Sequence, residues 1–307
     1  MPHLLDDDFV QDLLSGSLSN LLEYVTEDPS LDLQIRDNYI NIYYRGGNIL
    51  KADKKGEGYA FFFDENYFKG NQTNSKDALF ALLNKSNWDD YIPEAKRVMD
   101  KFFGASKNEE REFQQLVIRD NNVSSLANGT DFFIIDVEYA YLNVGIFDLV
   151  AVEWRSEGPK RKYPDKHKPV LYIIEMKYGD KALKGKSGLK DHQEQFHHLA
   201  TNEVYLEQFK QEMIALFEQK RNLGLIPSLS KTNNPNTVSG FNDDLQFAFL
   251  LANHDPASEL LIKELKLLEF HDVRFIVSNF MGYGIYHQSV FSYPQYRERF
   301  MRQIYEK

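Results

Sequence analysis

The stretch VLYIIEMKYG, residues 170–179, runs five apolar or aromatic residues into a glutamate, a methionine and a lysine before it stops at a glycine. A short apolar run that is rich in β-branched residues is typical of a buried strand. Because side chains alternate along a strand, Glu175 and Lys177 share one face. Buried charges cost free energy unless they are paired or used, so the end of this strand is the first candidate for a functional site.

Composition predicts a well-filled globular protein. The 307 residues are 42% hydrophobic and 14% aromatic, which argues against disorder. No apolar run approaches the roughly 20 residues that span a bilayer, and the acidic first residues lack the order of a signal peptide. The absence of cysteine excludes disulfides, thiolate catalysis and Cys-ligated metals. We therefore expect a cytoplasmic protein that does not bind membranes.

The charge is unevenly distributed along the chain. The net charge is −10, which opposes nucleic-acid binding, but residues 159–190 carry ten Lys or Arg against three acids. An acidic body with one basic strip is compatible with a phosphate ligand held at that strip. A lysine-rich, solvated loop explains the strip equally well when it is considered alone.

Periodicity and turn residues predict an α/β protein with a mixed, α+β-type sheet. The predicted domains are 1–105, a wing or specificity region with a helix, an antiparallel meander and further helices, and 106–307, the core with a C-terminal extension. In chain order we expect a helix at 4–26, a hairpin over 31–52 with a Gly46-Gly47 turn, a third strand at 59–63, helices within 75–122, strands at 131–142, 145–154 and 170–179, a long helix at 188–222, a polar loop at 223–244, a strand at 245–251, a helix at 256–268 and a strand at 273–280.

Further acids stand on the two strands that precede the opening one. Asp148 lies within FDLVAVEW, where an aspartate inside an apolar strand is unusual, and it can approach Glu175 if the strands pair. Glu138 and Asp136 lie on the strand before that. Three converging acids repel one another unless a divalent cation lies between them, and carboxylates without His or Cys suit Mg²⁺ or Mn²⁺.

Each of these residues also has a plain structural interpretation. An acid two residues before a lysine occurs elsewhere on polar loops and helices, and only Glu175 and Lys177 end a buried strand. That pair can be a structural ion pair, Glu138 can be an exposed strand residue, and Asp136 is expected at the surface beside a hairpin. Polar residues that begin the following helix are candidate phosphate contacts, namely Lys190, His192 and Gln193.

The order of helix, strands and acids resembles the PD-(D/E)XK nuclease superfamily over about residues 108–251. In that resemblance Asp148 matches the first acid, Glu175 the second, Lys177 the lysine and Glu138 an additional upstream acid. It implies a restriction-endonuclease-like αβββαβ core and Mg²⁺-dependent cleavage of nucleic acid, with DNA expected rather than RNA. Asp148, Glu175, Glu138 and the Met176 carbonyl would then bind the metal, with Lys177 at the attacking water. Phe147 stands where the name-giving pattern has proline.

Two alternatives belong to other functional classes. The first is a catalytically silent module with the same core that binds nucleic acid or a protein partner, which the net charge favours. The second is a homodimer or a subunit of a larger defence or repair complex that is active only when assembled. A shift of thermal stability with Mg²⁺ or Mn²⁺ separates a metal enzyme from a silent module.

Overall fold

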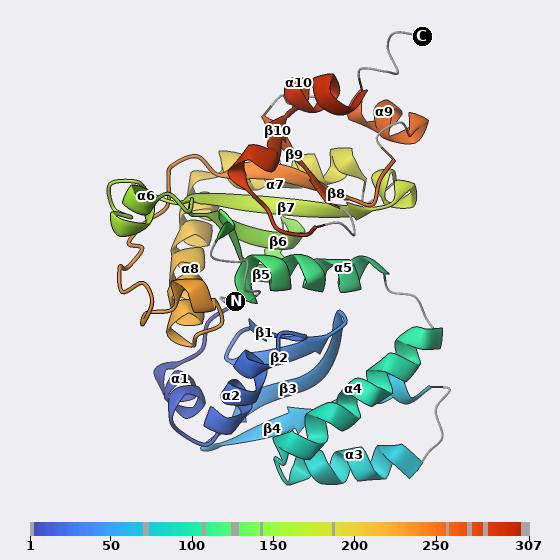
Figure 1. The fold of residues 1–307 in the computed structure, drawn as a ribbon, viewed down its shortest axis with the longest axis vertical. Helices are drawn as coiled ribbons and strands as arrows, with labels where there is room; N and C mark the ends of the chain where they lie inside the picture. The colour runs from blue at the N-terminus through green and yellow to red at the C-terminus, as the bar shows by residue number, and fades with distance from the viewer. Residues whose placement is uncertain are drawn as a thin grey trace. The chain divides into compact units, whose positions relative to one another are not determined.

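The computed structural model is a mixed α/β protein whose chain divides into two compact units (Figure 1). The first contains Met1–Arg119 and Gln219–Asn233, and the second contains Asp120–Glu218 and Asn234–Lys307. The structure describes residues 3–69, 74–105, 109–123, 129–141, 144–185, 188–255, 258–268, 272–278 and 282–301. The domain boundary expected after residue 105 precedes helix α5 (Glu109–Ile118), which is grouped with the first unit.

A four-stranded antiparallel sheet forms the centre of the first unit. Its strands lie in sequence order: β1 (Leu31–Ile35), β2 (Tyr39–Tyr44), β3 (Gly47–Lys55) and β4 (Gly58–Phe62). The hairpin expected over 31–52 is three strands, because Asn38 turns the chain with a left-handed φ of 53°. Asparagine visits this region more readily than most residues do. The strand expected third, at 59–63, is therefore the fourth.

Helices of the first unit surround this sheet. They are α1 (Asp7–Leu14), α2 (Ser19–Glu27), α3 (Asn74–Asn84), α4 (Trp88–Ala105) and α5, with a 3₁₀ turn η1 (Glu65–Phe68). The single helix expected at 4–26 is broken into α1 and α2. A side chain at Gly16 would lie 2.8 Å from the Cα of Asp12, so the close turn between these helices requires glycine.

Residues 219–233 complete the first unit from a distant part of the chain. The side chain of Gln219 accepts from the N–H of Leu5 (3.0 Å) and donates to its carbonyl (2.7 Å). Lys220 Nζ donates to Gln34 Oε1 at 2.8 Å, and both side chains are buried. Gln34 in turn donates to both carboxylate oxygens of Asp32. This segment also contains the 3₁₀ turn η5 (Pro227–Leu229).

A six-stranded mixed sheet forms the centre of the second unit. Its spatial order is β10-β9-β8-β7-β6-β5, with antiparallel pairing from β5 to β7, parallel pairing from β7 to β9, and an antiparallel β10. The strands are β5 (Phe132–Tyr141), β6 (Gly145–Glu153), β7 (Val170–Tyr178), β8 (Gln246–Ala252), β9 (Val273–Ser278) and β10 (Val290–Ser292). The expected antiparallel meander of three strands is confirmed by this register.

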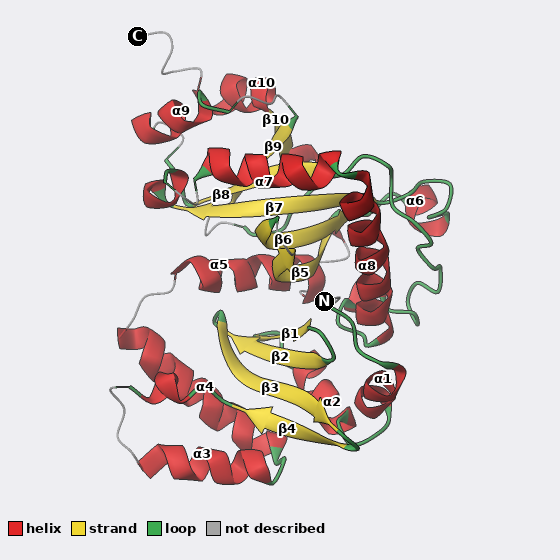
Figure 2. Ribbon diagram, turned by 180° about the vertical axis from the view of Figure 1, so that it is seen from behind, coloured by secondary structure: helices red, strands yellow, loops and turns green. Residues whose placement is uncertain are grey.

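Helices of the second unit flank its sheet. They are α6 (Gly158–Lys162), α7 (Leu189–Thr201), α8 (Glu203–Asn222), α9 (Glu259–Leu265) and α10 (Tyr293–Tyr296), with the shorter turns η2 (Arg119–Val123), η4 (Asp180–Leu183), η6 (His287–Ser289) and η7 (Arg297–Met301). The helix expected at 188–222 is two helices, because Asn202 takes an extended conformation. Helix α7 lies along the sheet, where Phe196 stacks on Phe247 with ring centroids 4.8 Å apart (Figure 2).

Near the C-terminus the expected helix is shorter than predicted, as α9, whereas the strand expected at 273–280 is confirmed over its described residues, as β9. Helix α9 is capped by Ser258, whose side chain accepts from the N–H of Leu261 at 3.2 Å, instead of by Asp255. Residues 256–257 and 279–280 of those predictions lie outside the described residues. Across the part of the chain that the structure describes, no helix is both long and apolar enough to cross a membrane.

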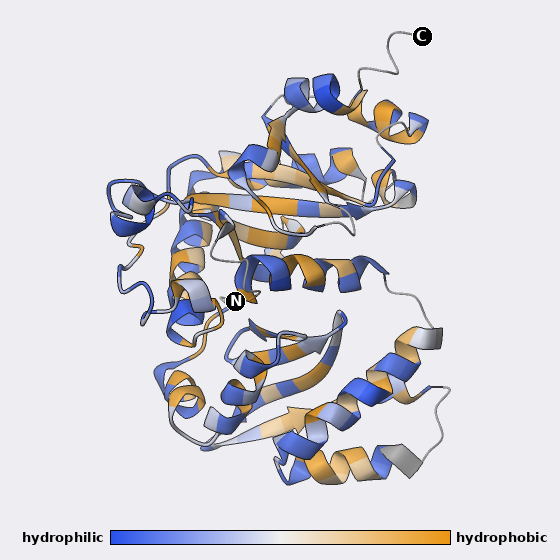
Figure 3. Cartoon of the chain, in the orientation of Figure 1, coloured by the Kyte–Doolittle hydropathy of each residue, from blue (hydrophilic) through white to orange (hydrophobic). Residues whose placement is uncertain are grey.

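The apolar core of the second unit runs through the middle of its sheet. Figure 3 shows β6 and β7 coloured largely as hydrophobic, with hydrophilic colour toward the end of β7. Residues 171–177 of β7 are all buried, and so are residues 247–252 of β8. Strands covered on both faces read as continuous apolar runs. This is why Glu175 and Lys177 stand out in the sequence.

Asn122 holds β5 where its register with β6 shifts between Ile134 and Asp136. Its buried amide accepts from the N–H of Ile134 (2.8 Å) and donates to the carbonyl of the same residue (2.7 Å). Asn122→Ala leaves both backbone groups without partners. We expect it to lower the free energy of unfolding by about 2–4 kcal/mol.

The measurement is urea unfolding in a Trp88→Phe background, in which Trp154 fluorescence reports on the second unit alone. The control is Gln211→Ala, which removes an exposed amide from α8 and should change stability by less than about 0.5 kcal/mol. Equal effects of the two substitutions would show that the Asn122 bonds do not stabilise this sheet.

Candidate active site

The pairing of β6 with β7 brings Asp148 beside Glu175. The ladder ends with Leu149 opposite Ile174, so the next residues outward are Asp148 and Glu175. Residues opposite one another in an antiparallel pair share a face. Asp148 Oδ2 also accepts from the N–H of Met176 at 2.8 Å. The structure thus brings together the first two acids predicted from the sequence.

Glu138 lies in the same row of the sheet. Val137 pairs with Leu149 and Tyr139 pairs with Phe147, which leaves Glu138 opposite Asp148. Its φ of 50° is in the left-handed region, where a non-glycine residue is strained. Because this φ interrupts the pleat, its place in the row does not fix the direction of its side chain.

Asp136 is not at the surface, as the sequence led us to expect. The residue is 0% exposed, and its Oδ1 accepts from the N–H of Val137 at 2.8 Å. A surface location beside the hairpin was expected, but Asp136 lies within β5 opposite Val150, five residues before the last pair of the ladder, Tyr141 and Gly145. The register shift between Ile134 and Asp136 also changes which face the later residues of β5 occupy.

Glu175, Lys177 and His192 form a buried charged cluster. Lys177 Nζ donates to Glu175 Oε1 at 2.7 Å, and the two side chains are only 4% and 3% exposed. His192 Nε2 lies 2.9 Å from the same oxygen. Its ring is not aligned for a well-directed hydrogen bond, so the contact is an ion pair when the ring is protonated. Glu175 Oε2 is buried with no hydrogen-bond partner among the residues that the structure describes.

The surroundings of Glu175 favour its charged form. Burial raises the pKa of its carboxyl, but the contact with His192 and the charge of Lys177 outweigh burial and hold the pKa below its usual range. A carboxylate that stays ionised inside a sheet is available to a cation at neutral pH.

Two glycines shape the chain between β7 and the helix that carries His192. Gly179 ends β7 with a left-handed φ of 66°, and Gly188 precedes α7. A side chain on Gly188 would lie 2.9 Å from the carbonyl oxygen of Leu183, so only glycine fits this approach. Helix α7 can therefore begin close to the end of β7, and His192 stands on its first turn.

The other candidate residues of α7 differ in their surroundings. Gln193 is 2% exposed, whereas Lys190 is exposed and lies 3.8 Å from Glu194 on its own helix. The sequence placed Lys190, His192 and Gln193 together as candidate phosphate contacts. The structure brings His192 to Glu175, a contact that the sequence did not predict.

His254 also belongs to this region and was missed. Its Nε2 lies 3.0 Å from the carbonyl oxygen of Lys177, and its Nδ1 lies 3.2 Å from Asp180 Oδ1. Ser258 Oγ donates to the other Asp180 oxygen at 2.6 Å. His254 follows the end of β8, and the parallel pairing of β8 with β7 brings it to the end of β7. A single sequence does not reveal this pairing, so it could not indicate that His254 lies near Lys177.

Among the described residues, no three His, Asp or Glu side chains are grouped as ligands for one metal ion. No family model matches the chain, and neither a curated protein nor a solved structure was found to match it. The geometry of Asp148, Glu175 and Lys177 is therefore the basis on which a function is inferred.

The cluster can be tested by its effect on stability. Lys177→Met leaves the Glu175 carboxylate buried with His192 as its remaining contact among the described side chains, and breaking a buried ion pair in this way costs about 3–5 kcal/mol. The double variant Glu175→Gln/Lys177→Met removes both charges. We expect it to be less destabilised than Lys177→Met when urea unfolding is measured at neutral pH.

Lys263→Met is the matched control, since Lys263 is exposed on α9 of the same unit, and it should change stability by less than about 0.5 kcal/mol. The single variant Glu175→Gln completes the cycle. If the effects of Glu175→Gln and Lys177→Met were strictly additive in the double variant, Glu175 and Lys177 would not be energetically coupled.

Proposed function

We propose that this protein is a metal-dependent nuclease that hydrolyses phosphodiester bonds in nucleic acid, with DNA as the first substrate class. The observation that carries the proposal is the juxtaposition of Asp148 and Glu175 on paired strands, with Lys177 bonded to Glu175. Two acids and a lysine from adjacent strands form a compact polar site beside the apolar runs of β6 and β7.

The donor set fits Mg²⁺ or Mn²⁺. Asp148 and Glu175 supply carboxylate oxygens, and Glu175 Oε2 is a buried acceptor without a hydrogen-bond partner among the described residues. Mg²⁺ characteristically uses one or two protein carboxylates and completes its shell with water and substrate phosphate. Two acids are therefore sufficient, and Glu138 and the Met176 carbonyl are further proposed ligands.

Each protein group has a distinct proposed task. Asp148 and Glu175 hold the metal, which when bound lowers the pKa of water and offsets charge on the phosphate oxygens. Lys177 provides an ammonium group that orients the attacking water or stabilises charge developing on the phosphate. His192 contacts Glu175 Oε1, so it restrains the carboxylate from helix α7.

The succession of elements supports the same assignment. The chain runs α5, β5, β6, β7, α7 and β8, with the short helix α6 between β6 and β7 and with α8 as a second helix before β8. The main elements therefore follow the αβββαβ order of the PD-(D/E)XK resemblance. Strand β8 is parallel to β7, and β5 to β7 form a meander. Helix α5 is grouped with the first unit, so the second unit alone contributes the strands and the later helices.

One observation favours a catalytically silent module. Lys177 already neutralises Glu175, and His192 contacts the same carboxylate oxygen, as they would in a purely structural cluster. A silent module would retain this cluster for the stability or specificity of the fold. Metal binding and cleavage distinguish the two functions.

Cleavage is the first test. Plasmid DNA, single-stranded DNA and RNA are incubated with Mg²⁺ or Mn²⁺ and the wild type, Asp148→Asn or Lys177→Met. We expect each substitution to lower the rate by at least about 100-fold, because removing one preorganised electrostatic group costs this much in comparable sites. Lys263→Met, on the exposed side of α9, should cleave like the wild type. Undiminished cleavage by both site variants would show that the site is elsewhere.

Metal-dependent stabilisation is the second test. A ligand that binds only the folded state at 100 times its Kd adds about 2.7 kcal/mol to stability. Mn²⁺ or Mg²⁺ should therefore raise the Tm of the wild type and of Lys263→Met, but not that of Asp148→Asn/Glu175→Gln. An unchanged Tm of the wild type would favour the silent module.

A further inference from the structure

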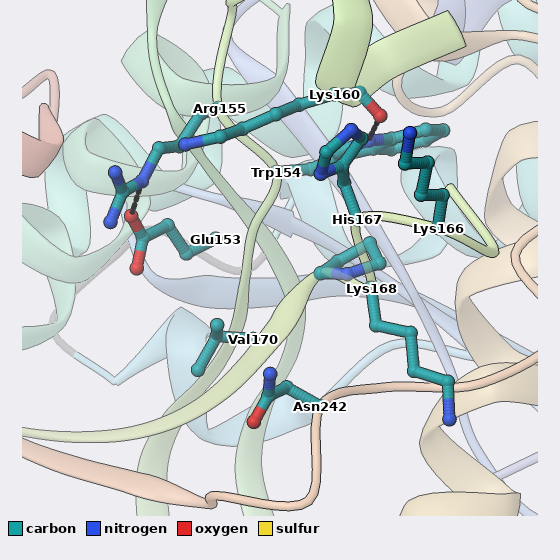
Figure 4. Close-up of a pocket in the computed structure, with 10 residues that line it drawn as sticks. Glu153, Trp154, Arg155, Lys160, Lys166, His167, Lys168, Val170 and Asn242 are labelled. Carbon is teal, nitrogen blue, oxygen red and sulfur yellow. Dashed lines mark hydrogen bonds and ion pairs between the residues drawn. The ribbon is translucent and has the colours of Figure 1, made fainter. Parts of the chain in front are cut away.

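A second candidate binding site lies at the opposite end of β7. A pocket of about 320 Å³ opens where β6 ends and β7 begins. Its walls come from residues 153–155, Lys160 of α6, residues 166–170 and Asn242. Figure 4 shows Glu153 and Arg155 on one side of the view, Lys166 and Lys168 on the other, and Val170 and Asn242 between and below them. All of these residues belong to the second unit.

The pocket is strongly cationic in a protein whose net charge is −10. Its lining includes Arg155, Lys160, Lys166 and Lys168, and its only lining acid is Glu153. Lys160 Nζ forms an ion pair with Glu157 Oε1 at 3.1 Å, and Glu157 is not a lining residue of the pocket. Lys166 and Lys168 have no ion-pair partner among the described residues. Unpaired cations gathered around a cavity attract an anion.

Arg155 is held in place by a buried carboxylate at the end of β6. Its Nε donates to Glu153 Oε1 at 2.7 Å, and Glu153 is only 4% exposed. The two terminal nitrogens of the guanidinium have no hydrogen-bond partner within the described part of the chain. A planar guanidinium fixed at one nitrogen presents the others in the geometry that suits phosphate oxygens.

Backbone and side-chain hydrogen bonds fix the rim of this pocket. The buried Trp154 donates from Nε1 to the carbonyl of Lys160 at 3.1 Å. The N–H of Asn242 donates to the carbonyl of Pro169 at 2.8 Å, and the N–H of His167 donates to the carbonyl of Tyr163 at 3.0 Å. Both the β6 side and the opposite wall are therefore positioned by the fold before any ligand arrives.

We propose that this pocket binds the phosphate group of a nucleotide or of a nucleic-acid strand. Arg155, Lys166 and Lys168 provide the charge, and Asn242 provides an amide. The volume is at the lower end of the range for small-ligand sites, so it admits a phosphate with part of its attached sugar. Trp154 is buried, so its ring offers no face to a base, and recognition rests on the phosphate.

The pocket and the acidic cluster lie on one strand. Glu175 follows Val170 by five positions, which is about 16 Å of extended chain at roughly 3.3 Å per residue. If the proposed nuclease function holds, on which this point rests, a nucleic-acid strand that is cleaved near Glu175 would place in the pocket a phosphate several nucleotides from the cleaved bond. Binding of a free nucleotide does not depend on that function.

The experiment compares two matched double variants of the full chain. Lys166→Gln/Lys168→Gln alters the pocket, and Lys263→Gln/Lys266→Gln removes the same charge from exposed positions of the α9 segment in the same unit. Calorimetry in EDTA measures binding of thymidine 5′-monophosphate, thymidine and a single-stranded oligonucleotide. EDTA keeps cleavage and metal binding out of the measurement, so failure of the nuclease proposal leaves this test intact.

We expect the pocket variant to lose at least about tenfold in affinity for the monophosphate, because charged hydrogen bonds to phosphate are lost. The control variant should bind as the wild type does, and thymidine should not distinguish the proteins. If a nucleic-acid strand is the ligand, the pocket variant also binds the oligonucleotide more weakly than the wild type does. The magnitude of the slope of log affinity against log salt concentration then decreases by about 1. If a free nucleotide is the ligand, the monophosphate alone is affected.

Three results would overturn the proposal. They are wild-type affinity of the pocket variant for both phosphate probes, equal losses in the pocket and control variants, and failure of the wild type to prefer the monophosphate to thymidine. Equal losses would mean that only net charge matters. Circular dichroism spectra of both variants establish that neither has unfolded.

Discussion

The hydrogen bond from the N–H of Met176 to Asp148 Oδ2 is the constraint on which the site depends. The backbone ladder between β6 and β7 ends at Leu149 and Ile174, two residues before Met176, while β7 continues beside β8. A buried N–H at that point needs an acceptor, and a carboxylate supplies it without another strand. The same bond holds Asp148 against β7 next to Glu175. The Asp148 side chain thereby satisfies the buried N–H of Met176 and also brings its own carboxylate next to that of Glu175.

The sequence was informative wherever structure follows from local pattern. The alternating and apolar runs located β5 to β9, and the isolated charges of β7 marked the site. Prediction failed where a single residue changed the geometry, as with the left-handed Asn38 and the extended Asn202. It failed again where distant segments meet, as with His192 at Glu175 and His254 at Lys177. The bulge in β5 combines both problems, because it changes which face the later residues of the strand occupy without any glycine or proline to signal it.

Strand β7 carries two contrasting electrostatic environments. At Glu175 and Lys177 opposite charges are buried and largely cancel, so the cluster adds little to the field at a distance. At its first residue, Val170, exposed cations exceed acids and attract anions from solution. A chain with a net charge of −10 can thus present a local positive field without giving up its acidic surface elsewhere. Local arrangement, more than total charge, determines which ligands such a protein can attract.

The return of residues 219–233 to the first unit bears on how the protein folds as it is synthesised. The chain passes between the units three times, after Arg119, Glu218 and Asn233. Domains usually fold in order as they leave the ribosome. Here a nascent chain ending at residue 119 has Gln34 in a prospective core without its partner Lys220, and the N-terminal Leu5 without Gln219. The first unit cannot reach its final state until residue 233 has been translated, by which point residues 120–218 of the second unit have already been made. A large part of the second unit is therefore present on the nascent chain before the first unit can be completed.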